Sequence, residues 1–378
     1  MIDLSVDDRS PAELVAFSHL RWNFVWQRPQ HLLNRLAQGR TLWFVEEPLP
    51  VAGIDEPVLR HERHGAVRRV WLEVPGETGH VCFSDVRGAT YATRLRRLLG
   101  EREDRAAWLY TPMALSLVDA IGLPLLAYDV MDDLASFAGA SPELRSHQLE
   151  ALRRASVVFT GGRSLHRGAT KHRSQDIHCF PSGVEPNHYA PAIAMRRNLS
   201  GRAVAGYVGV IDERLDLDLV AGLADALPDW EIRMVGPVVK ISESSLPRRD
   251  NITYPGSAQY AELPSVMAGF DVALMPFAMN EATRSISPTK TLEYLAAGLP
   301  VVSTRVPDVV ADYSMIVDLQ DDAGGFARAC RKVLDDCPDA RAKQASALLH
   351  EQHWDTIAHR MDALLQLAHA GRTLEVSA

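Results

Sequence analysis

The chain has 378 residues, of which 47% are hydrophobic and 23% charged, and its formal net charge at pH 7 is −8. A chain of this length can form two globular domains, and its negative charge argues against nucleic acid as a partner. The acidic N-terminus lacks a signal-peptide pattern and there is no run of about 18 apolar residues that could span a membrane, so we expect a cytoplasmic protein.

Strand-like apolar runs alternate with helix-like segments along the first half of the chain. This alternation predicts an α/β fold with mainly parallel sheets. A polar loop rich in aromatic residues separates the first expected strand from the first expected helix. In this half the expected strands are 14–17, 41–45, 67–74, 107–110, 125–128 and 157–160, and the expected helices are 29–38, 89–99, 114–121 and 142–155.

The second half restarts with a strand after the turn-rich segment Phe180–Pro191. We place the linker near 192–201, so the predicted domains are 1–191 and 201–350, followed by a C-terminal helical segment at 351–372. The same alternation again predicts a parallel α/β arrangement. In this half the expected strands are 203–208, 232–235, 252–254, 272–275 and 301–304, and the expected helices are 289–297 and 354–367.

The segment Asn280–Thr304 combines a turn, a short helix and a buried strand. Pro288 suits the first helical turn, because its missing N–H is not needed there. The unpaired N–H groups and the positive dipole end of a helix start favour anions, and Lys290 adds a charge at this point. Glu293 lies one turn further along. We therefore predict that this junction holds a diphosphate and a ribose hydroxyl together.

Three motifs resemble those of one enzyme family. The pattern P-x-K-x-x-E-Y-L-A-x-G-x-P-V-V, residues 288–302, resembles the nucleotide-sugar site of GT-B glycosyltransferases of family 4, the glycosyl transferases group 1 type. The segment 180–191 is similar to the element that closes the first domain in that family. W-Q-R-P-Q-H, residues 26–31, is similar to a motif in members that assemble bacterial cell-surface polysaccharides. The alternative is that any α/β protein can end a helix with A-G-x-P-V-V.

The resemblance implies the GT-B fold, in which two Rossmann-like domains have parallel sheets facing across a cleft. The first domain would bind the acceptor, the second would bind the nucleotide sugar, and the C-terminal helix would pack back on the first domain. The implied activity moves a sugar from a nucleotide-diphosphate donor to a saccharide, lipid-linked or small-molecule acceptor in polysaccharide or glycoconjugate biosynthesis. Transfer would occur with retention and would need neither a metal nor a cofactor, because helix dipoles and basic side chains neutralise the leaving phosphate.

The resemblance also implies that Glu293 binds the donor ribose and that the helix start before it binds the diphosphate. Two positions depart from the family pattern. Val210 stands where the family has an arginine, with Arg214 nearest to its expected lysine, and Ser285 stands where the family has the first glutamate of an E-x7-E signature. The identity of the donated sugar therefore stays open. The donor-binding residues that we predict are Gly209, Arg214, Gly236, Gly256, Tyr260, Leu263, Ser285, Ser287, Pro288, Thr289, Lys290 and Glu293.

The loop Ser18–Leu32 is unusually dense in tryptophan, arginine and histidine. Because it follows the first strand of a parallel sheet, it should lie at the carboxyl edge, where α/β proteins bind ligands. Tryptophan faces stack on sugar C–H surfaces, and an arginine at a helix start can reach a phosphate. The alternative is a loop that only packs on the core. The acceptor-binding residues that we predict are His19, Arg21, Trp22, Trp26 and Arg28.

Asp129 and Asp132 follow the expected strand at 125–128. An inverting transferase needs a general base at about this place, and either carboxylate could serve. The alternative for Asp132 or Asp133 is to cap a helix N-terminus. The catalytic residues that we predict are Asp129, Asp132, Lys290 and Glu293.

No metal site is predicted. The nearest acidic pairs, Asp132-Asp133 and Asp216-x-Asp218, are better explained as helix starts or solvated surface. The four cysteines are widely spaced without a C-x-x-C pair, so we expect reduced thiols. The fourteen histidines show no ligand-spaced cluster, and we place His61 and His64 beside a loop.

The helix Tyr91–Leu99 is basic and partly amphipathic. Such a face could dock on anionic lipid at the inner side of the membrane, as in many GT-B enzymes with lipid-linked acceptors. The alternative is an ordinary solvated surface.

Other functions also fit the sequence. One is an inverting transferase, or a sugar-nucleotide epimerase, of the same fold. Another is a non-catalytic nucleotide-sugar-binding subunit of a polysaccharide-assembly complex, which the changes at Val210 and Ser285 would favour. Fold alone does not decide among them.

Overall fold

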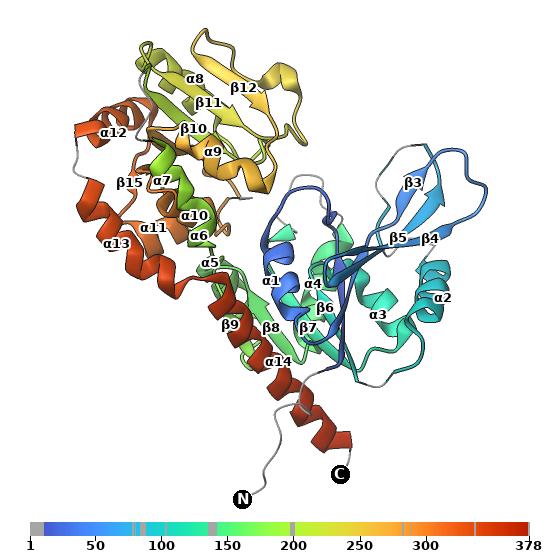
Figure 1. Ribbon diagram of the computed structural model, residues 1–378. Coiled ribbons are helices and arrows are strands. Elements are labelled where there is room, and N and C mark those ends of the chain that lie inside the picture. The colour runs from blue at the N-terminus through green and yellow to red at the C-terminus, as the bar shows by residue number, and fades with distance from the viewer. Residues whose placement is uncertain are drawn as a thin grey trace, which may run out of the picture. The chain divides into compact units, whose positions relative to one another are not determined.

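The computed structural model divides the chain into two compact units, each with its own hydrophobic core (Figure 1). The first unit comprises Met1–Gly161, Leu165–Phe180 and Asp355–Ala378, and the second comprises Gly162–Ser164 and Pro181–Trp354. The structure describes residues 11–77, 79, 81–83, 88–102, 104–134, 142–196, 201–281, 283–287, 289–335 and 338–376.

The boundary between the units differs from the predicted one. We expected the first domain to extend to residue 191, but the chain passes into the second unit at Pro181. Tyr189 and Ala192 are buried in the core of the second unit, with exposed fractions of 1% and 0%. Burial of these apolar side chains assigns the turn-rich segment to that unit. The turn-rich segment therefore begins where the chain leaves the first unit, and its other residues belong to the second.

Within its described residues, the first unit contains a nine-stranded sheet in the order β3-β5-β2-β1-β6-β7-β8-β9, with β4 paired to β5. The β4–β5 pair is antiparallel and the other pairs are parallel. Strands β1, β6 and β7 are buried along their whole length, as is typical of parallel strands with both faces covered. The strands are β1 (Glu13–Ser18), β2 (Thr41–Glu46), β3 (Leu49–Val51), β4 (Val58–His64), β5 (Val67–Pro75), β6 (Arg105–Leu109), β7 (Leu125–Val130), β8 (Val157–Thr160) and β9 (Ile177–Cys179).

The helices of the first unit confirm the four predicted in this half, with small shifts at their ends. The first of them begins directly after the aromatic loop, where Gln27 and Gln30 form a reciprocal capping box and Pro29 occupies the first turn. The helices are α1 (Arg28–Leu36), α2 (Gly88–Leu99), α3 (Leu115–Ile121), α4 (Pro142–Arg154), α5 (Arg163–Ala169) and α14 (Trp354–Val376).

Helix α14 lies against the sheet of the first unit, beside β9 (Figure 1). Its Asp355 pairs with Arg35 at 2.5 Å, and its Asp362 pairs with Arg40 at 2.6 Å. Neither this helix nor any other in the described part of the chain has the length and apolar character needed to cross a membrane.

Strand β4 refines the prediction that His61 and His64 lie beside a loop. Both residues lie in an edge strand that pairs with β5 along its whole length, and the turn at 65–66 follows His64 directly. Its side chains alternate only weakly between half-buried and exposed. Because most of its residues are charged or polar, the strand lacks the apolar alternation from which strands are predicted. The same charges disfavour pairing of this edge with another chain.

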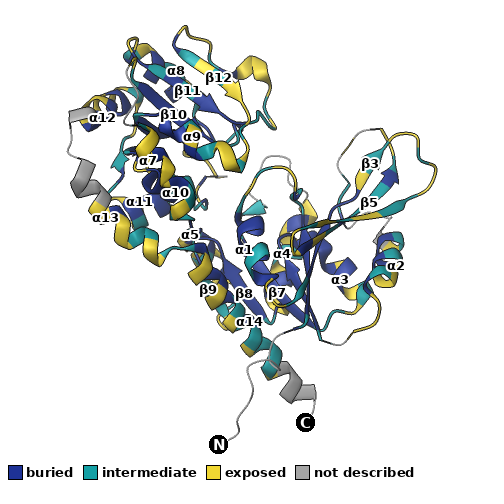
Figure 2. Ribbon diagram, viewed as in Figure 1, coloured by how far each residue is buried: buried dark blue, intermediate teal, exposed yellow. Residues whose placement is uncertain are grey.

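The second unit contains a six-stranded sheet within its described residues, in the order β12-β11-β10-β13-β14-β15. Its pairs are parallel, and the central strands are buried throughout (Figure 2). This order confirms the predicted parallel α/β arrangement. The strands are β10 (Val204–Val208), β11 (Glu231–Val235), β12 (Ile252–Gly256), β13 (Val272–Met275), β14 (Val301–Ser303) and β15 (Asp318–Leu319).

Short helices surround this second sheet. Two of them, at 290–296 and 186–189, pack against each other, which brings the predicted donor motif next to the turn-rich segment. The α-helices are α6 (Pro186–Tyr189), α7 (Pro191–Arg196), α8 (Leu217–Ala226), α9 (Leu263–Ala268), α10 (Lys290–Ala296), α11 (Pro307–Tyr313), α12 (Ala323–Asp335) and α13 (Pro338–Glu351), and a short 3-10 turn, η5, spans Tyr260–Glu262.

Candidate functional site

Two glycines end the central strands of the second unit and bring their backbones together. Gly209 follows β10 with φ +152°, and Gly236 follows β11 with φ +150°. A Cβ atom on Gly236 would lie 1.8 Å from the carbonyl oxygen of Gly209, so no larger residue fits there. The two glycines expose backbone at the carboxyl edge of the sheet, where α/β proteins bind ligands.

Lys290 lies directly beside Gly209. A Cβ atom on Gly209 would lie 2.0 Å from Cε of Lys290 and 2.6 Å from its Nζ. The ammonium group also lies 5.8 Å from the centre of the Tyr207 ring. Absence of a side chain at Gly209 therefore leaves the space in which the lysine crosses the end of β10.

Helix α10 is fixed to the sheet at this point. The backbone N–H of Val208 donates a hydrogen bond of 2.8 Å to the Tyr294 hydroxyl. Thr289 already has a helical conformation, and its carbonyl accepts from the N–H groups of Leu292 and Glu293. The N–H groups of the first turn have no acceptor within the helix, as at any helix start. Together with Lys290 they make this edge of the sheet attractive to an anion.

Glu293 is half-buried on the next turn of α10. Burial raises the pKa of its carboxyl group, while Lys290 and the Tyr189 hydroxyl act in the opposite direction. A carboxylate that has lost part of its hydration is a strong acceptor for hydroxyl groups of a bound ligand. The distance in sequence from Lys290 places the acid and the base on one side of the helix.

The loop before α10 is ordered by its own side chains. The Asn280 N–H donates to the Thr283 hydroxyl at 3.0 Å, and the Thr283 N–H donates to the Asn280 side-chain oxygen at 3.1 Å. Thr283 is fully buried. Ser285 and Ser287, which follow, are half-buried, whereas Pro288 lies outside the described residues.

Arg214 is paired with a neighbouring carboxylate. Its guanidinium hydrogen-bonds to Asp212, with Nε to Oδ1 at 3.0 Å, Nε to Oδ2 at 3.1 Å and Nη2 to Oδ2 at 2.8 Å. The Asp212 side chain is 5% exposed and that of Arg214 is 26% exposed. The charge of Arg214 is thus partly neutralised, and its diphosphate role stays a prediction. The D-x-R spacing was visible in the sequence, but it did not show that the two side chains pair.

The predicted nucleobase segment is only partly accessible. Gly256 has φ +90° and open space around it, and Leu263 starts α9. The Tyr260 hydroxyl, in contrast, donates to Glu185 at 2.5 Å, and its ring is stacked on His188 with centroids 4.0 Å apart. Tyr260 thus packs against the turn-rich segment. The sequence had not marked Glu185 or His188 as part of any site.

In the first unit, Arg28 and Asp129 form a buried ion pair. The Arg28 Nε lies 2.9 Å from Asp129 Oδ2 and Nη2 lies 2.9 Å from Oδ1, with side-chain exposures of 3% and 0%. Nη1 donates to the carbonyl of Phe180 at 2.8 Å. A phosphate ligand or a general base must reach the substrate, and neither group can. We therefore withdraw the acceptor role of Arg28 and the catalytic role of Asp129.

Glu46 organises the aromatic loop in a similar way. This buried carboxylate accepts from the Trp22 N–H at 2.8 Å and from Arg69 at 2.7 Å, and it lies 3.1 Å from Arg21. The Trp22 ring is 5% exposed and meets the Phe44 ring edge-on at 4.9 Å. Arg21 and Trp22 therefore hold the loop in place, and the alternative of a loop that packs on the core applies to them.

Other predicted acceptor residues remain accessible. Trp26 is 39% exposed and Phe24 is 53% exposed. His19 and Asp132 are half-buried. Phe24 and Trp26 lie in the loop between β1 and α1, and Asp132 follows β7. Phe24 was not among the predicted residues, and Asp132 was predicted as a catalytic residue.

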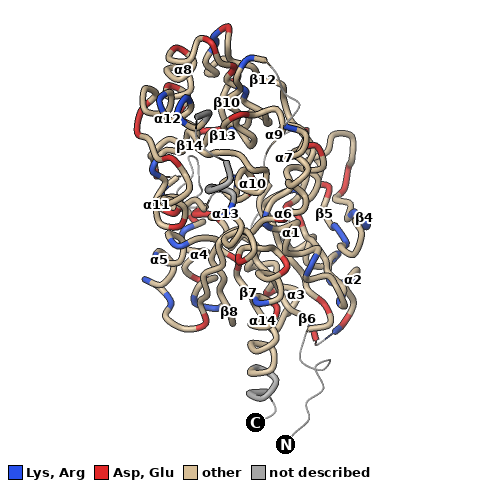
Figure 3. The backbone as a smooth tube through the Cα atoms, turned by 60° about the vertical axis from the view of Figure 1, so that its left-hand side comes forward, with Lys and Arg blue, Asp and Glu red and all other residues tan. Residues whose placement is uncertain are grey.

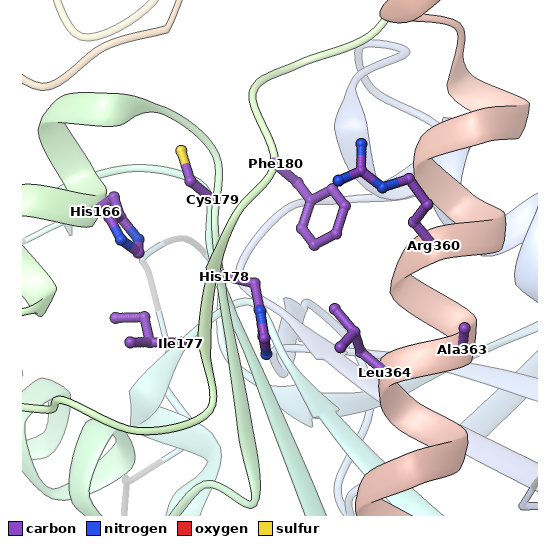
Figure 4. A pocket seen from close by; sticks show the side chains of 8 residues that line it. All are labelled: His166, Ile177, His178, Cys179, Phe180, Arg360, Ala363 and Leu364. Carbon is purple, nitrogen blue, oxygen red and sulfur yellow. The ribbon is translucent and has the colours of Figure 1, made fainter.

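A cavity of about 500 Å³ also opens in the first unit (Figure 4). In Figure 4, His178 and Phe180 point from the β9 edge towards α14, and the Arg360 guanidinium lies 5.3 Å from the centre of the Phe180 ring. Burial lowers the pKa of His178. The cavity is lined by His166, Ile177, His178, Cys179, Phe180, Arg360, Ala363 and Leu364, none of which the sequence predicted as a site residue.

The described residues hold no group of three or more histidine, cysteine, aspartate or glutamate side chains that could ligate a metal. Asp216 caps α8 by accepting from the Leu219 N–H at 2.8 Å. This confirms the reading of Asp216-x-Asp218 as a helix start.

Residues 202–336, which include both glycines and α10, match the family model of the glycosyl transferases group 1. This region is a glycosyl transferases group 1 domain. One relative is TuaH of Bacillus subtilis (strain 168), which is named as a glycosyltransferase of teichuronic acid biosynthesis. It is 28% identical to this chain over 229 residues. The alignment covers 57% of this chain and 57% of the relative, so the chain matches little more than half of that protein.

The solved structures that resemble the whole chain share its fold at low sequence identity. A UDP-forming α,α-trehalose-phosphate synthase from Burkholderia xenovorans superposes with a TM-score of 0.69 at 13% identity, over 94% of this chain and 98% of that one. Sucrose-phosphate synthase from Thermosynechococcus elongatus gives 0.68 at 14% identity, over 97% and 100%. Anabaena HepE in complex with UDP and glucose gives 0.65 at 14% identity, over 93% and 98%. The chain with its group 1 domain therefore has the GT-B fold.

Proposed function

We propose that this protein transfers a sugar from a nucleoside-diphosphate donor to an acceptor hydroxyl. The observation that carries the proposal is the position of Lys290 against Gly209, with Glu293 on the next turn of the same helix. One site thus offers a cation and backbone N–H groups for a diphosphate and a carboxylate for ribose hydroxyls. The match of this region to the group 1 family supports the same assignment.

The chemistry asks these residues to stabilise a leaving group. When the C1–O bond to the diphosphate breaks, negative charge develops on the departing oxygen, beside Lys290 and the first turn of α10. Donors that are already in place stabilise such charge without reorganisation. Glu293 contributes by holding the ribose, which fixes the diphosphate relative to the lysine.

We propose that the reaction retains the configuration at C1 and needs no metal or other cofactor. In that reaction the departing phosphate oxygen takes the proton of the acceptor hydroxyl while the new C1–O bond forms. No side-chain base is then required, which agrees with burial of Asp129. Asp132 remains the carboxylate to test if the configuration proves to be inverted.

UDP is the first donor nucleotide to test, because several structures with the same fold are named as UDP-forming or contain UDP. The acceptor that we propose is a saccharide, a lipid-linked saccharide or a small molecule, and the name of TuaH favours a polysaccharide pathway. Nucleic acid is not proposed as a partner, since the chain carries a net charge of −8.

We also propose a cytoplasmic location with peripheral contact to the inner face of the membrane. Arg63 and Arg68 are exposed and directly opposite each other on the β4–β5 hairpin, where like charges repel. Figure 3 shows basic segments in the region of β4 and β5. Helix α2 packs against β4 and adds exposed Arg96 and Arg97. A surface of this kind attracts anionic lipid headgroups. Sedimentation with vesicles that contain anionic lipid tests the contact, and vesicles of neutral lipid alone are the control.

Thermal-shift measurements with UDP, GDP, ADP, dTDP and their sugar conjugates, with and without EDTA, test the donor site. A shift of several degrees with one nucleotide that EDTA leaves unchanged is the expected result. Product analysis with that sugar conjugate and candidate acceptors then tests the transfer. If no nucleotide shifts the unfolding temperature, the proposal fails.

A second candidate function is donor binding without catalysis. The pairing of Arg214 with Asp212 favours it, because one of the cations that the family places near the diphosphate is already neutralised here. In that case a nucleotide sugar would bind, but neither transfer to an acceptor nor slow hydrolysis of the donor would be detected.

A further inference from the structure

Tyr189 combines deep burial with an unused hydroxyl group. It lies at the end of α6 and is 1% exposed. Among the described residues its hydroxyl has no partner in hydrogen-bonding geometry. A buried polar group without a partner is costly, so its presence calls for an explanation. The helices α6 and α10, which carry Tyr189 and Glu293, pack against each other. In addition, each of the two groups shifts the pKa of the other.

The surrounding side chains hold Tyr189 in place. His188 meets its ring edge-on at 4.8 Å, and Tyr260 meets it edge-on at 6.2 Å. His188 also stacks flat on Tyr260 and its Nε2 bonds to the Tyr260 carbonyl at 2.9 Å. An aromatic cluster therefore fixes the Tyr189 ring on α6, the helix that packs against α10.

The number of protons in this cluster limits what each hydroxyl can do. The single phenolic proton of Tyr260 is already donated to Glu185, at 2.5 Å. The Tyr260 oxygen can therefore only accept from Tyr189. The proton of Tyr189 is the one left to donate, either to Tyr260 or to Glu293. An ionised carboxylate is the better acceptor.

We propose that Tyr189 is a positioning residue of the donor site: when a nucleoside diphosphate binds, the Tyr189 hydroxyl donates to the Glu293 carboxylate and orients that group to accept the ribose hydroxyls. This inference rests on the proposed function of Lys290 and Glu293. It explains why a tyrosine, whose hydroxyl would otherwise lack a hydrogen-bond partner, occupies a buried position. It also assigns a task to the turn-rich segment.

The groups that act on Glu293 set the direction of the effect. Burial raises the pKa of its carboxyl group, and Lys290 on the same helix and Tyr189 from α6 lower it. Tyr260 and Tyr294 are neutral phenols that interact with it electrostatically, and Glu185 accepts the hydrogen bond of the Tyr260 hydroxyl. Arg196 meets the far end of α10, where it donates to the Ala297 carbonyl at 2.7 Å. Loss of the Tyr189 proton donor should therefore make Glu293 harder to ionise.

The test compares wild type, Tyr189→Phe and the control Tyr313→Phe, which removes another buried hydroxyl of the same unit. Calorimetric titration uses UDP and GDP and their 2′-deoxy forms over about pH 5–8. In Tyr189→Phe, binding should be lost at a higher pH as the solution is acidified. The preference for the ribose over the deoxyribose nucleotide should fall about 3–10-fold, the value of one hydrogen bond. Tyr313→Phe should match wild type in both.

A second variant, Tyr260→Phe, removes the competing acceptor and leaves Tyr189 with Glu293 alone. Its ribose preference should be kept or increased. A fall like that of Tyr189→Phe would show that packing of the cluster matters and would overturn the inference. So would a Tyr189→Phe protein with the pH profile and ribose preference of wild type. Failure of wild type to bind either nucleotide would instead refute the proposed function, which separates the two.

Discussion

A Cβ atom on Gly209 would lie 2.0 Å from Cε of Lys290. The two residues depend on each other, because the lysine side chain occupies the space that a side chain at residue 209 would fill. Gly209, which follows the strand, and the P-x-K-x-x-E pattern at the start of the helix therefore belong to one site, although they are about 80 residues apart in the chain.

Gly209→Ala should displace Lys290 and reduce affinity for the donor nucleotide about 10–100-fold, the usual result of moving a charged contact by about 1 Å. Gly201→Ala is a matched control, because Gly201 also has φ +152° but has open space around it. Both variants strain the backbone and should lose similar stability. Titration calorimetry and thermal unfolding separate the two effects. Equal loss of affinity in both variants would contradict the role of the Gly209–Lys290 contact.

Lys290→Met keeps the unbranched shape and most of the length of the side chain but removes its charge. We expect kcat/KM to fall about 10²–10³-fold, as when one donor to a developing negative charge is lost. Affinity for the nucleoside without phosphates should change little, whereas affinity for the diphosphate should fall. Steady-state kinetics and titrations with uridine and UDP check both statements. If uridine and UDP lose affinity to the same degree, the lysine acts on the fold and not on the diphosphate.

Glu293→Gln should separate stability from function. Burial raises the folded-state pKa of this carboxyl group above the ordinary value of 4.5, so folding favours its protonated form. Its contribution to stability is thus present at low pH and is lost as the pH rises through the folded pKa. Near pH 8 the glutamine variant should unfold at a higher temperature than wild type, by about 2–4 °C for each kcal/mol gained in the free energy of unfolding. This difference in unfolding temperature should become smaller as the pH falls towards 4.5.

The same variant should bind the donor nucleotide more weakly, since a neutral amide accepts ribose hydroxyls less well. Glu281→Gln, on an exposed residue of the preceding loop, is the control and should change neither property. A Glu293→Gln protein that is less stable than wild type at pH 8 would mean that the Glu293 carboxylate is held by favourable contacts in the free protein.

The sequence predicted those strands that are buried as continuous apolar runs, such as β10 and β13. It also predicted α10 from its composition and from Gly298, which ends it with φ +69°. It did not predict the charged edge strand β4 or the short helices α6 and α7. Their residues carry turn and charge signals, and only their contacts with other elements of the same unit show which structure they form.

Among the site residues, Lys290 and Glu293 could be predicted because their motif is local. The roles of Arg28 and Tyr189 could not, because both depend on partners that are distant in the sequence. Asp129 is 101 residues from Arg28, and Glu293 meets Tyr189 through packing of two helices. An arginine at a helix start looks like a phosphate ligand until its buried carboxylate partner is known.

The Arg28–Asp129 pair should therefore act on stability. Arg28→Met leaves the Asp129 carboxylate buried without a partner and should cost about 3–5 kcal/mol. The double variant Arg28→Met/Asp129→Leu should lose less than the sum of the single variants. Arg102→Met breaks an exposed pair with Asp104 and should change stability little. Urea unfolding followed by circular dichroism measures these three variants and Asp129→Leu alone. A stable Arg28→Met protein that has lost only acceptor use would restore the original assignment.

The two tryptophans of the aromatic loop should respond in opposite ways. Trp22 is 5% exposed and packs on Phe44, so Trp22→Ala should cost about 3–5 kcal/mol of stability.

Trp26 is 39% exposed, with its indole N–H 3.4 Å from His31. Trp26→Ala should leave thermal unfolding nearly unchanged and should raise KM for the acceptor, because an exposed indole face is the surface on which a sugar ring stacks. Donor affinity, measured by titration with the nucleotide alone, should stay at the wild-type value. If Trp26→Ala weakens donor binding as much as it weakens acceptor use, Trp26 does not belong to an acceptor site.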